Sequence, residues 1–167
     1  MRVATTVGKK IQGRKRHLLV DTQGLLICVK VLAADIGDRE GGKVMLHPLA
    51  GKMPRLQLIW ADSGYAGEPF THWVKDHLGV RLDIVNHPWT GLRGVWVKEG
   101  MAVDWDQIIP KGFHVLPRRW VVERTNAWIT HNRRLSRDFE GTHTSSETFI
   151  YLAMARIMMA RLARARP

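Results

Sequence analysis

The sequence predicts a single α/β domain whose functional site lies at one edge of a sheet. Short β-favouring runs alternate with helical patterns along the chain, an order typical of α/β domains. Two acidic residues stand at informative places, Asp62 directly after a buried strand and Glu123 on a late helix. The 167 residues suffice for one hydrophobic core and leave little room for a second. We therefore expect one unit over residues 1–167.

The first part of the chain predicts a hairpin, a weak helix and a buried strand. Residues 16–21 and 25–33 are rich in Leu, Val and Ile, and the turn between them contains Gly24, so they read as a hairpin. Residues 39–53 carry a helical pattern that several glycines and a proline interrupt. Residues 56–61 form an apolar run that stops abruptly, as a buried strand does where it reaches a loop.

A second helix and strand follow, and then a long irregular segment. Pro69 suits the first turn of a helix that Gly79 ends by supplying a left-handed cap, and residues 80–84 alternate as a strand does. Residues 87–117 contain three tryptophans with several glycines and prolines. Loops longer than about 15 residues are uncommon in compact domains unless they are functional or disordered. We expect residues 87–117 to be a loop insertion that packs on the domain.

Glu123 lies on a predicted helix with one polar, mostly basic face. At about 100° per residue, the polar residues within about 60° of it are Arg119, Asn126, Thr130, Arg134 and Arg137. Val121, Trp128 and Leu135 form an apolar stripe on the opposite side. A carboxylate among arginines is either part of a solvated, salt-bridged surface or a functional group.

The last helix is predicted to begin at a capping box, Thr144-Ser145-Ser146-Glu147. Its pattern predicts that Phe149, Leu152, Ala153 and Met159, or their neighbours, are buried.

The charge of the chain favours a polyanionic partner. Lys and Arg number 26 against 15 Asp and Glu, a formal net charge of +11. The basic residues gather in three blocks, which suits nucleic acid better than a small anion. A structural RNA-binding protein would explain the charge but not the two acids. The candidate DNA-binding residues are Lys9, Lys10, Arg14, Lys15, Arg16, Arg119, Arg133, Arg134 and Arg137.

The remaining composition excludes membrane and disulfide classes. Cys28, inside an apolar run, is the single cysteine, so no disulfide forms within one chain, and we expect it to be a small buried hydrophobe. No stretch approaches the ~18 apolar residues of a membrane span, and the N-terminus lacks the apolar core of a signal peptide. We therefore expect a cytoplasmic protein.

Asp62 and Glu123, if the fold brings them together, form a site for hard cations. Carboxylate oxygens are the ligands that Mg²⁺ and Mn²⁺ prefer. Two such ions about 4 Å apart can activate a water or a 3′-hydroxyl in phosphodiester chemistry. Taken alone, Asp62 before Ser-Gly is equally well explained as a turn former.

Three ordered motifs resemble the bacterial insertion-sequence DDE transposases. They are Gly8-Lys9-Lys10-Ile11-Gln12-Gly13-Arg14-Lys15-Arg16-His17 with Val20-Asp21-Thr22, Ala61-Asp62-Ser63-Gly64-Tyr65-Ala66-Gly67, and Arg119-Trp120-Val121-Val122-Glu123-Arg124 through Asn132-Arg133-Arg134-Leu135. The resemblance implies a ribonuclease H-like mixed sheet with flanking helices and cut-and-paste DNA chemistry through three metal-binding acids. Asp62 matches the second aspartate and Glu123 the glutamate, and Arg119 matches an arginine of the glutamate helix. The implied partners are transposon ends and target DNA.

The chain departs from the family at the first catalytic aspartate. In the family that residue lies on the first strand, upstream of the Lys-Lys motif, and residues 1–7 contain no acid. Asp21 matches a family aspartate at the first hairpin, not the catalytic one. We therefore expect an N-terminally truncated domain that lacks its first central strand and is inactive alone. Three alternatives follow for the missing strand: residues 1–7 partly fill its place, a second polypeptide supplies it with its aspartate, or the chain folds poorly. A homodimer, and a non-catalytic DNA-binding remnant that regulates or poisons a full-length transposase, are left open as well.

Overall fold

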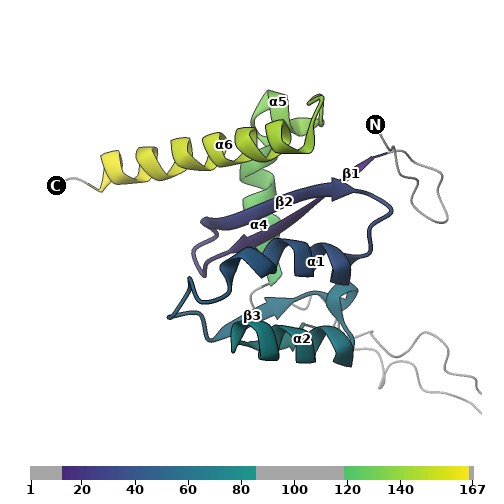
Figure 1. Ribbon diagram of the computed structural model, residues 1–167. Coiled ribbons are helices and arrows are strands. Elements are labelled where there is room, and N and C mark those ends of the chain that lie inside the picture. Colours follow the sequence, from purple (N-terminus) through teal and green to yellow (C-terminus); the bar gives the residue numbers. More distant parts are fainter. Residues whose placement is uncertain (1–12, 86–118, 166–167) are drawn as a thin grey trace, which may run out of the picture.

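The computed structural model describes residues 13–85 and 119–165, which form an α/β fold (Figure 1). The elements are β1 (Arg14–Val20), β2 (Leu26–Ala33), α1 (Asp38–Leu46), the 3₁₀ helix η1 (His47–Leu49), β3 (Leu58–Ala61), the 3₁₀ helix η2 (Ser63–Tyr65), α2 (Glu68–Leu78), β4 (Arg81–Ile84), α4 (Arg119–Thr130), α5 (Arg133–Ser136) and α6 (His143–Arg164). The predicted loop at residues 87–117 lies outside the described residues. No helix among the described residues is long and apolar enough to cross a membrane.

Among the residues that the structure describes, the strands form two small sheets. β1 and β2 pair antiparallel, and β3 and β4 pair parallel. The antiparallel pairing of β1 and β2 confirms the predicted hairpin. In its turn, the Asp21 carboxylate accepts hydrogen bonds from the backbone N–H groups of Gln23 and Leu25 at 2.8 Å each. Gly24 has a φ of 81°, the left-handed conformation that glycine adopts without strain. The turn chemistry thus accounts for the structural role of Asp21.

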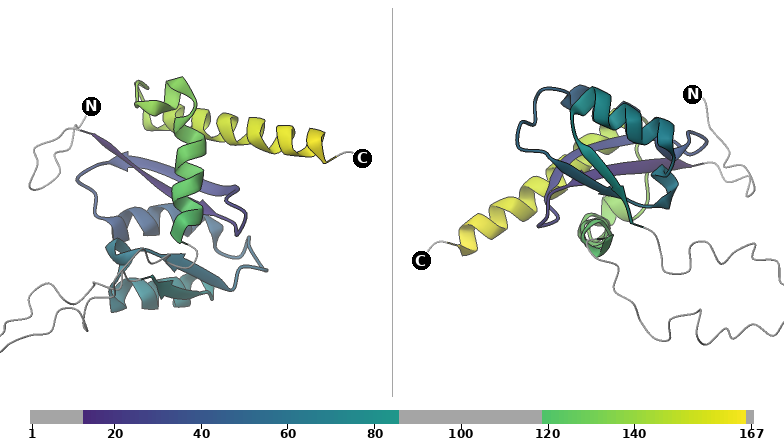
Figure 2. Two further views of the ribbon diagram at one scale, coloured as in Figure 1. Left: turned by 180° about the vertical axis from the view of Figure 1, so that it is seen from behind. Right: turned by 90° about the horizontal axis from the view of Figure 1, so that it is seen from below.

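Within residues 13–85 and 119–165, two hydrophobic clusters hold the elements together. In the first, α1 and α2 pack on β1, β3 and β4 around Phe70 and Val74, which are nearly fully buried. In the second, β2 packs against α4 and α6 around Val31, Ile129 and Ile150. Helix α6 continues well beyond the sheets at its C-terminal end (Figure 2).

The helix that carries Glu123 is shorter than its periodicity predicts. It ends at Thr130, and α5 begins at Arg133. The Asn132 side-chain amide donates to the carbonyl oxygens of Trp128 and Ile129 at 3.3 and 3.1 Å, so a side chain satisfies the last carbonyls and the helix stops. The prediction that Arg134 and Arg137 share a helical face with Glu123 is therefore wrong.

Two further predictions about helices are corrected. The predicted helix over residues 39–53 ends at Leu46, before Pro48, and continues only as a short 3₁₀ turn. The last helix begins at His143, where the Thr142 hydroxyl accepts a hydrogen bond from the Ser145 N–H at 3.1 Å. Glu147, the predicted partner in the capping box, instead accepts hydrogen bonds from β2, including one from the Val31 N–H at 3.0 Å.

The buried face of α6 also differs in part from its prediction. Ala153 is buried as predicted, with its neighbours Ile150 and Met154. Leu152 and Met159 are exposed, at 58% and 63% of their surface. These side chains lie on the side of α6 that turns away from the second cluster, which explains the difference.

Candidate metal and DNA site

Asp62 lies directly after β3, at the end of a strand as the sequence predicts. Its backbone is extended, and its carboxylate accepts a hydrogen bond from the Gly64 N–H at 2.9 Å. The side chain thereby caps the short helix η2. Asp62 is exposed, so one of its oxygens can serve the turn while the carboxylate remains accessible from solvent.

Glu123 is positioned because α4 is fastened to the hairpin turn. The Thr125 hydroxyl, fully buried, donates a hydrogen bond to the Gly24 carbonyl oxygen at 2.7 Å, and the Arg124 guanidinium donates to that of Gln23 at 2.8 Å. A Cβ on Gly24 would lie 2.8 Å from the Thr125 hydroxyl oxygen, so the close approach requires glycine. Glu123 is exposed on the helix that these contacts hold against the hairpin.

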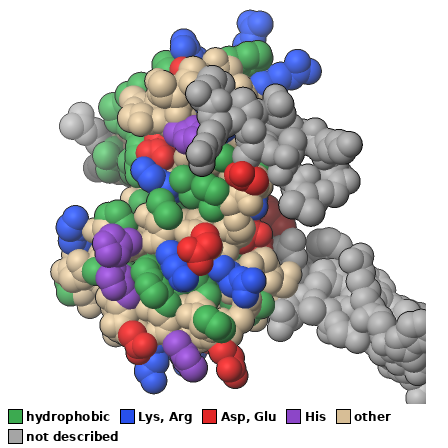
Figure 3. Space-filling model, turned by 45° about the vertical axis from the view of Figure 1, so that its right-hand side comes forward, with side chains coloured by type: hydrophobic (Ala, Val, Ile, Leu, Met, Phe, Trp, Pro, Cys, Tyr) green, Lys and Arg blue, Asp and Glu red, His purple; other side chains and the backbone are tan. Residues whose placement is uncertain are grey.

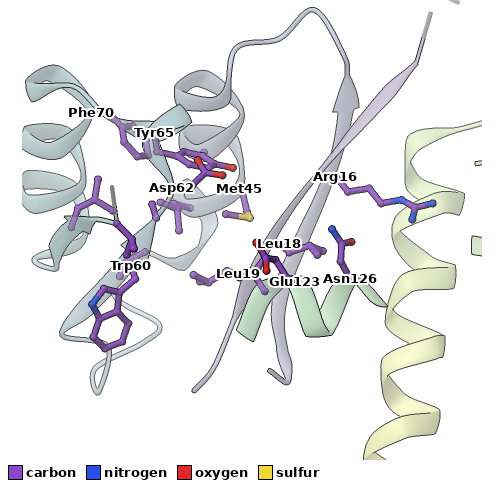
Figure 4. A pocket seen from close by; sticks show the side chains of 17 residues that line it. Arg16, Leu18, Leu19, Met45, Trp60, Asp62, Tyr65, Phe70, Glu123 and Asn126 are labelled. Carbon is purple, nitrogen blue, oxygen red and sulfur yellow. The ribbon is translucent and has the colours of Figure 1, made fainter. Parts of the chain in front are cut away.

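Both acids line one cavity of about 310 Å³ (Figure 4). Arg16 and Leu18 of β1 border it on one side and Trp60 of β3 on the other. In Figure 4 the Asp62 carboxylate lies beside Tyr65, and Glu123 lies across the cavity next to β1. The structure therefore brings together two residues that are far apart in the sequence.

The two carboxylates of this cavity, Asp62 and Glu123, are suitable ligands for a divalent cation but supply only part of its coordination shell. Carboxylate oxygens suit Mg²⁺ and Mn²⁺, and such ions keep several water or phosphate ligands. Within the described residues, no group of three or more His, Cys, Asp or Glu side chains could hold a metal ion. Asp62 and Glu123 could hold a cation that takes further ligands from elsewhere.

Three residues beside Asp62 are missing from the sequence-based site. The His17 Nδ1 lies 2.7 Å from the Tyr65 hydroxyl, and Asp38 forms an ion pair with Lys15 at 2.9 Å. A Cβ on Gly64 would lie 2.6 Å from an Asp38 oxygen and 3.1 Å from an Asp62 oxygen, so the two carboxylates flank this glycine. In the sequence Asp38 is visible only as an acid that follows a strand, and nothing local indicates its position next to Asp62.

The hydrogen bond between Tyr65 and His17 joins two groups whose pKa values are shifted mainly by burial. Burial, with the negative charges of Asp38 and Asp62 as lesser causes, raises the pKa of Tyr65 above its usual range. Burial also lowers the pKa of His17 from 6.5, against the opposing effect of Asp38. At neutral pH the hydrogen bond therefore joins a protonated Tyr65 hydroxyl to a neutral His17 ring, and the tautomer of His17 determines which of the two groups donates.

We expect the free energy of unfolding to fall as the pH drops below about 6.5. The pKa of His17 is lower in the folded chain than its value of 6.5 when unfolded, so the unfolded chain takes up the proton first. Stability rises with pH wherever the unfolded state binds more protons, so this contribution is complete above pH 6.5 and declines below it. Urea unfolding measured from pH 7.5 to pH 5 checks this.

The variant His17→Gln should flatten that decline, whereas His143→Gln, at an exposed histidine, should leave it unchanged. An equal decline in His17→Gln and the unaltered chain would contradict the assignment.

Three of the candidate DNA-binding residues hold the fold together. Arg14 donates to the Gly141 and Thr142 carbonyl oxygens at 3.1 and 3.3 Å and forms an ion pair with Asp138 at 3.3 Å. Lys15 and Arg16 are half-buried and donate to the carbonyl oxygens of Ile36 at 3.1 Å and Leu135 at 3.0 Å. These contacts use donors that a phosphate would otherwise engage.

The other basic candidates fall into three groups. Arg134 is exposed but donates to Glu140 at 2.7 Å and stacks on the Phe149 ring. Arg133 and Arg137 are exposed at the two ends of α5. Lys9, Lys10 and the Arg119 side chain lie outside the described residues. On the face seen in Figure 3, basic and acidic side chains are interspersed among the described residues, so that face is not uniformly basic.

The comparisons with known proteins agree with the motifs. The sequence profile of the transposase DDE domain matches residues 2–158. A protein of Burkholderia cepacia named as a transposase for insertion sequence element IS402 is 26% identical over 164 residues, which cover 92% of this chain and 66% of the relative. The chain thus spans just under two thirds of that relative's length. No solved structure matches the chain significantly. Because the profile matches nearly the whole sequence, the chain belongs to the DDE transposase family of insertion sequences.

Proposed function

We propose that the chain is the C-terminal catalytic part of an insertion-sequence DDE transposase, with Asp62 and Glu123 as ligands for Mg²⁺ or Mn²⁺. The observation that carries this proposal is that the two acids of separate motifs line one cavity. The bound ions would activate a water or 3′-hydroxyl and stabilise the leaving oxygen in phosphodiester cleavage and strand transfer. The proposed substrates are transposon ends and target DNA.

The residues of this chain have separate tasks in that proposal. Asp62 and Glu123 would hold the cations, and the exposed Arg133 and Arg137 would contact the phosphate backbone. The ion pair of Lys15 with Asp38 and the Tyr65–His17 hydrogen bond position the loop that carries Asp62. Arg119 would contact DNA from the first turn of α4.

The fold proposed for residues 1–167 is a single ribonuclease H-like domain that lacks its first central strand. Within the described residues, β1 pairs with β2 and β3 pairs with β4 in separate sheets. This arrangement supports the proposed fold, because a further strand between β1 and β3 would join the two sheets. The missing strand would also carry the first aspartate. We therefore propose that the chain is inactive alone and that a second polypeptide supplies the third acid. A homodimer is the other assembly proposed.

A second candidate function is a non-catalytic DNA-binding remnant that regulates or poisons a full-length transposase. The absence of a cluster of three acidic or histidine ligands among the described residues favours it. Both functions include DNA binding, and they differ in whether the chain gains activity when the third carboxylate is supplied.

We expect the purified chain to bind a duplex of about 30 base pairs at low salt without cutting it. Each neutralised phosphate contributes about −0.9 to the slope of log affinity against log salt, so several contacts give a steep loss of binding. Fluorescence anisotropy at increasing salt measures the slope. Nicking of supercoiled plasmid in Mg²⁺ or Mn²⁺ measures cleavage.

Two results would contradict this expectation. Absence of binding at the lowest salt would exclude DNA as the partner of this chain. Cation-dependent nicking that Asp62→Asn and Glu123→Gln abolish would show that the two acids suffice, so the chain would be active alone.

A further inference from the structure

We infer that a hollow between α4 and α6 is a further phosphate-binding site, which holds the backbone of duplex DNA away from the cavity of Asp62 and Glu123. Helix α6 passes the C-terminal end of α4 (Figure 2), and the hollow between them has a volume of about 370 Å³. It shares no lining residue with that cavity. Trp128, which lines it, lies about 140° around α4 from Glu123. The inference rests on the proposed function, which supplies DNA as the polyanion.

The hollow is lined by cations without a matching acid. Arg156, Arg161 and Arg164 of α6 line it, and no Asp or Glu does. Among residues 13–85 and 119–165, the guanidiniums of these three arginines form no hydrogen bond or ion pair. The donors of Arg14 and Arg16, in contrast, bind carbonyl oxygens of the chain itself. The arginines of the hollow therefore have donors available for an anion.

Stacked tryptophans hold one of these cations in place. The guanidinium carbons of Arg161 and Arg124 lie 4.5 and 4.8 Å from the centre of the Trp128 ring. Arg124 also lies 4.3 Å from the centre of the Trp120 ring and donates to the Gln23 carbonyl oxygen, so the stack is anchored to the hairpin turn. A stacked guanidinium keeps the N–H donors at its edge available and loses less entropy when it binds. Arg161 is thus oriented before a phosphate arrives.

The row of arginines fits a nucleic acid strand better than a single small anion. From Arg156 to Arg164 the helix rises about 12 Å, at about 1.5 Å per residue. One strand of DNA advances about 3.4 Å per nucleotide, so the row spans about three phosphates. Because two guanidiniums already stack on Trp128, we expect contacts to the backbone of a duplex instead of stacking of unpaired bases.

The helix dipole explains only part of this arrangement. Arg161 and Arg164 lie in the last turn of α6, where cations interact favourably with the dipole. Arg156 lies more than one turn before them, where the dipole has little effect. The dipole also gives no reason for Trp128 of another helix to hold Arg161.

A membrane surface fits the hollow less well than DNA does. Leu162 is an exposed apolar side chain on α6 and lies about 160° around the helix from Ala160, which lines the hollow. A membrane that received the Leu162 side chain would therefore lie on the side of α6 away from the hollow.

A single added carboxylate tests the hollow. Ala160 is exposed and lies four residues from both Arg156 and Arg164, so Ala160→Glu places an acid between two arginines. Opposite charges at this spacing support a helix, so the variant should fold. The matched control is Ala163→Glu, at an exposed position of α6 that does not line the hollow.

The readout is anisotropy of a labelled duplex with the full chain. We expect Ala160→Glu to weaken binding of a duplex of about 30 base pairs about tenfold near physiological salt and to reduce the magnitude of the salt slope by about 1.8, as for two lost phosphate contacts. Ala163→Glu should weaken it by less than about threefold, because it changes the net charge alone.

A second pair of variants removes cations without adding an acid. The combined changes Arg156→Ala, Arg161→Ala and Arg164→Ala should also weaken binding about tenfold or more. Their control removes three exposed cations from other elements, through Lys52→Ala, Arg55→Ala and Lys75→Ala, and lowers the net charge equally. Circular dichroism confirms that each variant folds, and either pair decides the outcome if a variant of the other pair does not.

Several results would overturn the inference. Equal weakening by a hollow variant and its control would show that net charge alone acts, and unchanged DNA affinity would exclude the hollow. Tighter binding of an RNA duplex of the same sequence, or a loss confined to phosphatidylcholine–phosphatidylserine vesicles, would assign the hollow to another partner. The unaltered chain separates the two proposals. If it does not bind DNA, both fail, whereas DNA binding that the hollow variants leave intact rejects the hollow alone.

Discussion

Gly41→Ala is expected to lower the free energy of unfolding by about 2 kcal/mol, although alanine is the better helix former. A Cβ at this position of α1 would lie within 3 Å of three atoms of the His17 ring. The ring is buried and its Nδ1 contacts the Tyr65 hydroxyl, so it has little space to move. The gain of about 1 kcal/mol in helix propensity is therefore smaller than the cost of overpacking. Urea unfolding measures the difference.

The matched control is Gly37→Ala at the start of the same helix, where a Cβ would meet nothing within 4 Å. That variant should change stability by less than about 1 kcal/mol, because the N-cap preference for glycine over alanine opposes the lower entropy of the unfolded alanine chain. In a His17→Ala background the penalty of Gly41→Ala should disappear, because the clashing ring is gone. A penalty that persists there would show that the backbone of α1, not His17, resists the added methyl group.

The sequence predicts those elements of the fold that short-range chemistry determines. Gly24 predicts the hairpin and Gly79 predicts the end of α2, where its φ is 68°. The end of α4 is missed because the apolar period continues to Leu135, while the Asn132 side chain ends the helix earlier. Periodicity reports which face is buried, and it does not report which side chain satisfies the terminal carbonyls.

The candidate site also contains residues that local motifs predict and residues whose role depends on distant parts of the chain. Asp62 and Glu123 stand out because each sits in a local motif, and the structure places both on one cavity. The role of Arg14 could not be read from its neighbours, because its partner Asp138 lies 124 residues further along the chain. A charged residue in a basic block has the same local pattern whether it contacts DNA or another element of the fold.

Arg133→Ala with Arg137→Ala is expected to weaken DNA binding about tenfold near physiological salt while changing stability by less than about 0.5 kcal/mol. Both side chains are exposed at the ends of α5. Each phosphate contact that is lost should also reduce the magnitude of the salt slope by about 0.9. Anisotropy titrations at several salt concentrations, together with urea unfolding, measure both quantities on the same protein.

Arg14→Ala is expected to lower stability and to leave DNA binding nearly unchanged. The Arg14 guanidinium donates to Asp138, Gly141 and Thr142, and these hydrogen bonds join β1 to the segment before α6. Its loss should cost about 2 kcal/mol of stability, in the range for hydrogen bonds to charged groups. Its effect on DNA affinity should be small in the fraction that remains folded. The two variants therefore change different quantities. If Arg14→Ala instead weakened DNA binding as much as the α5 pair without loss of stability, the internal contacts of Arg14 would give way to phosphate contacts when DNA binds.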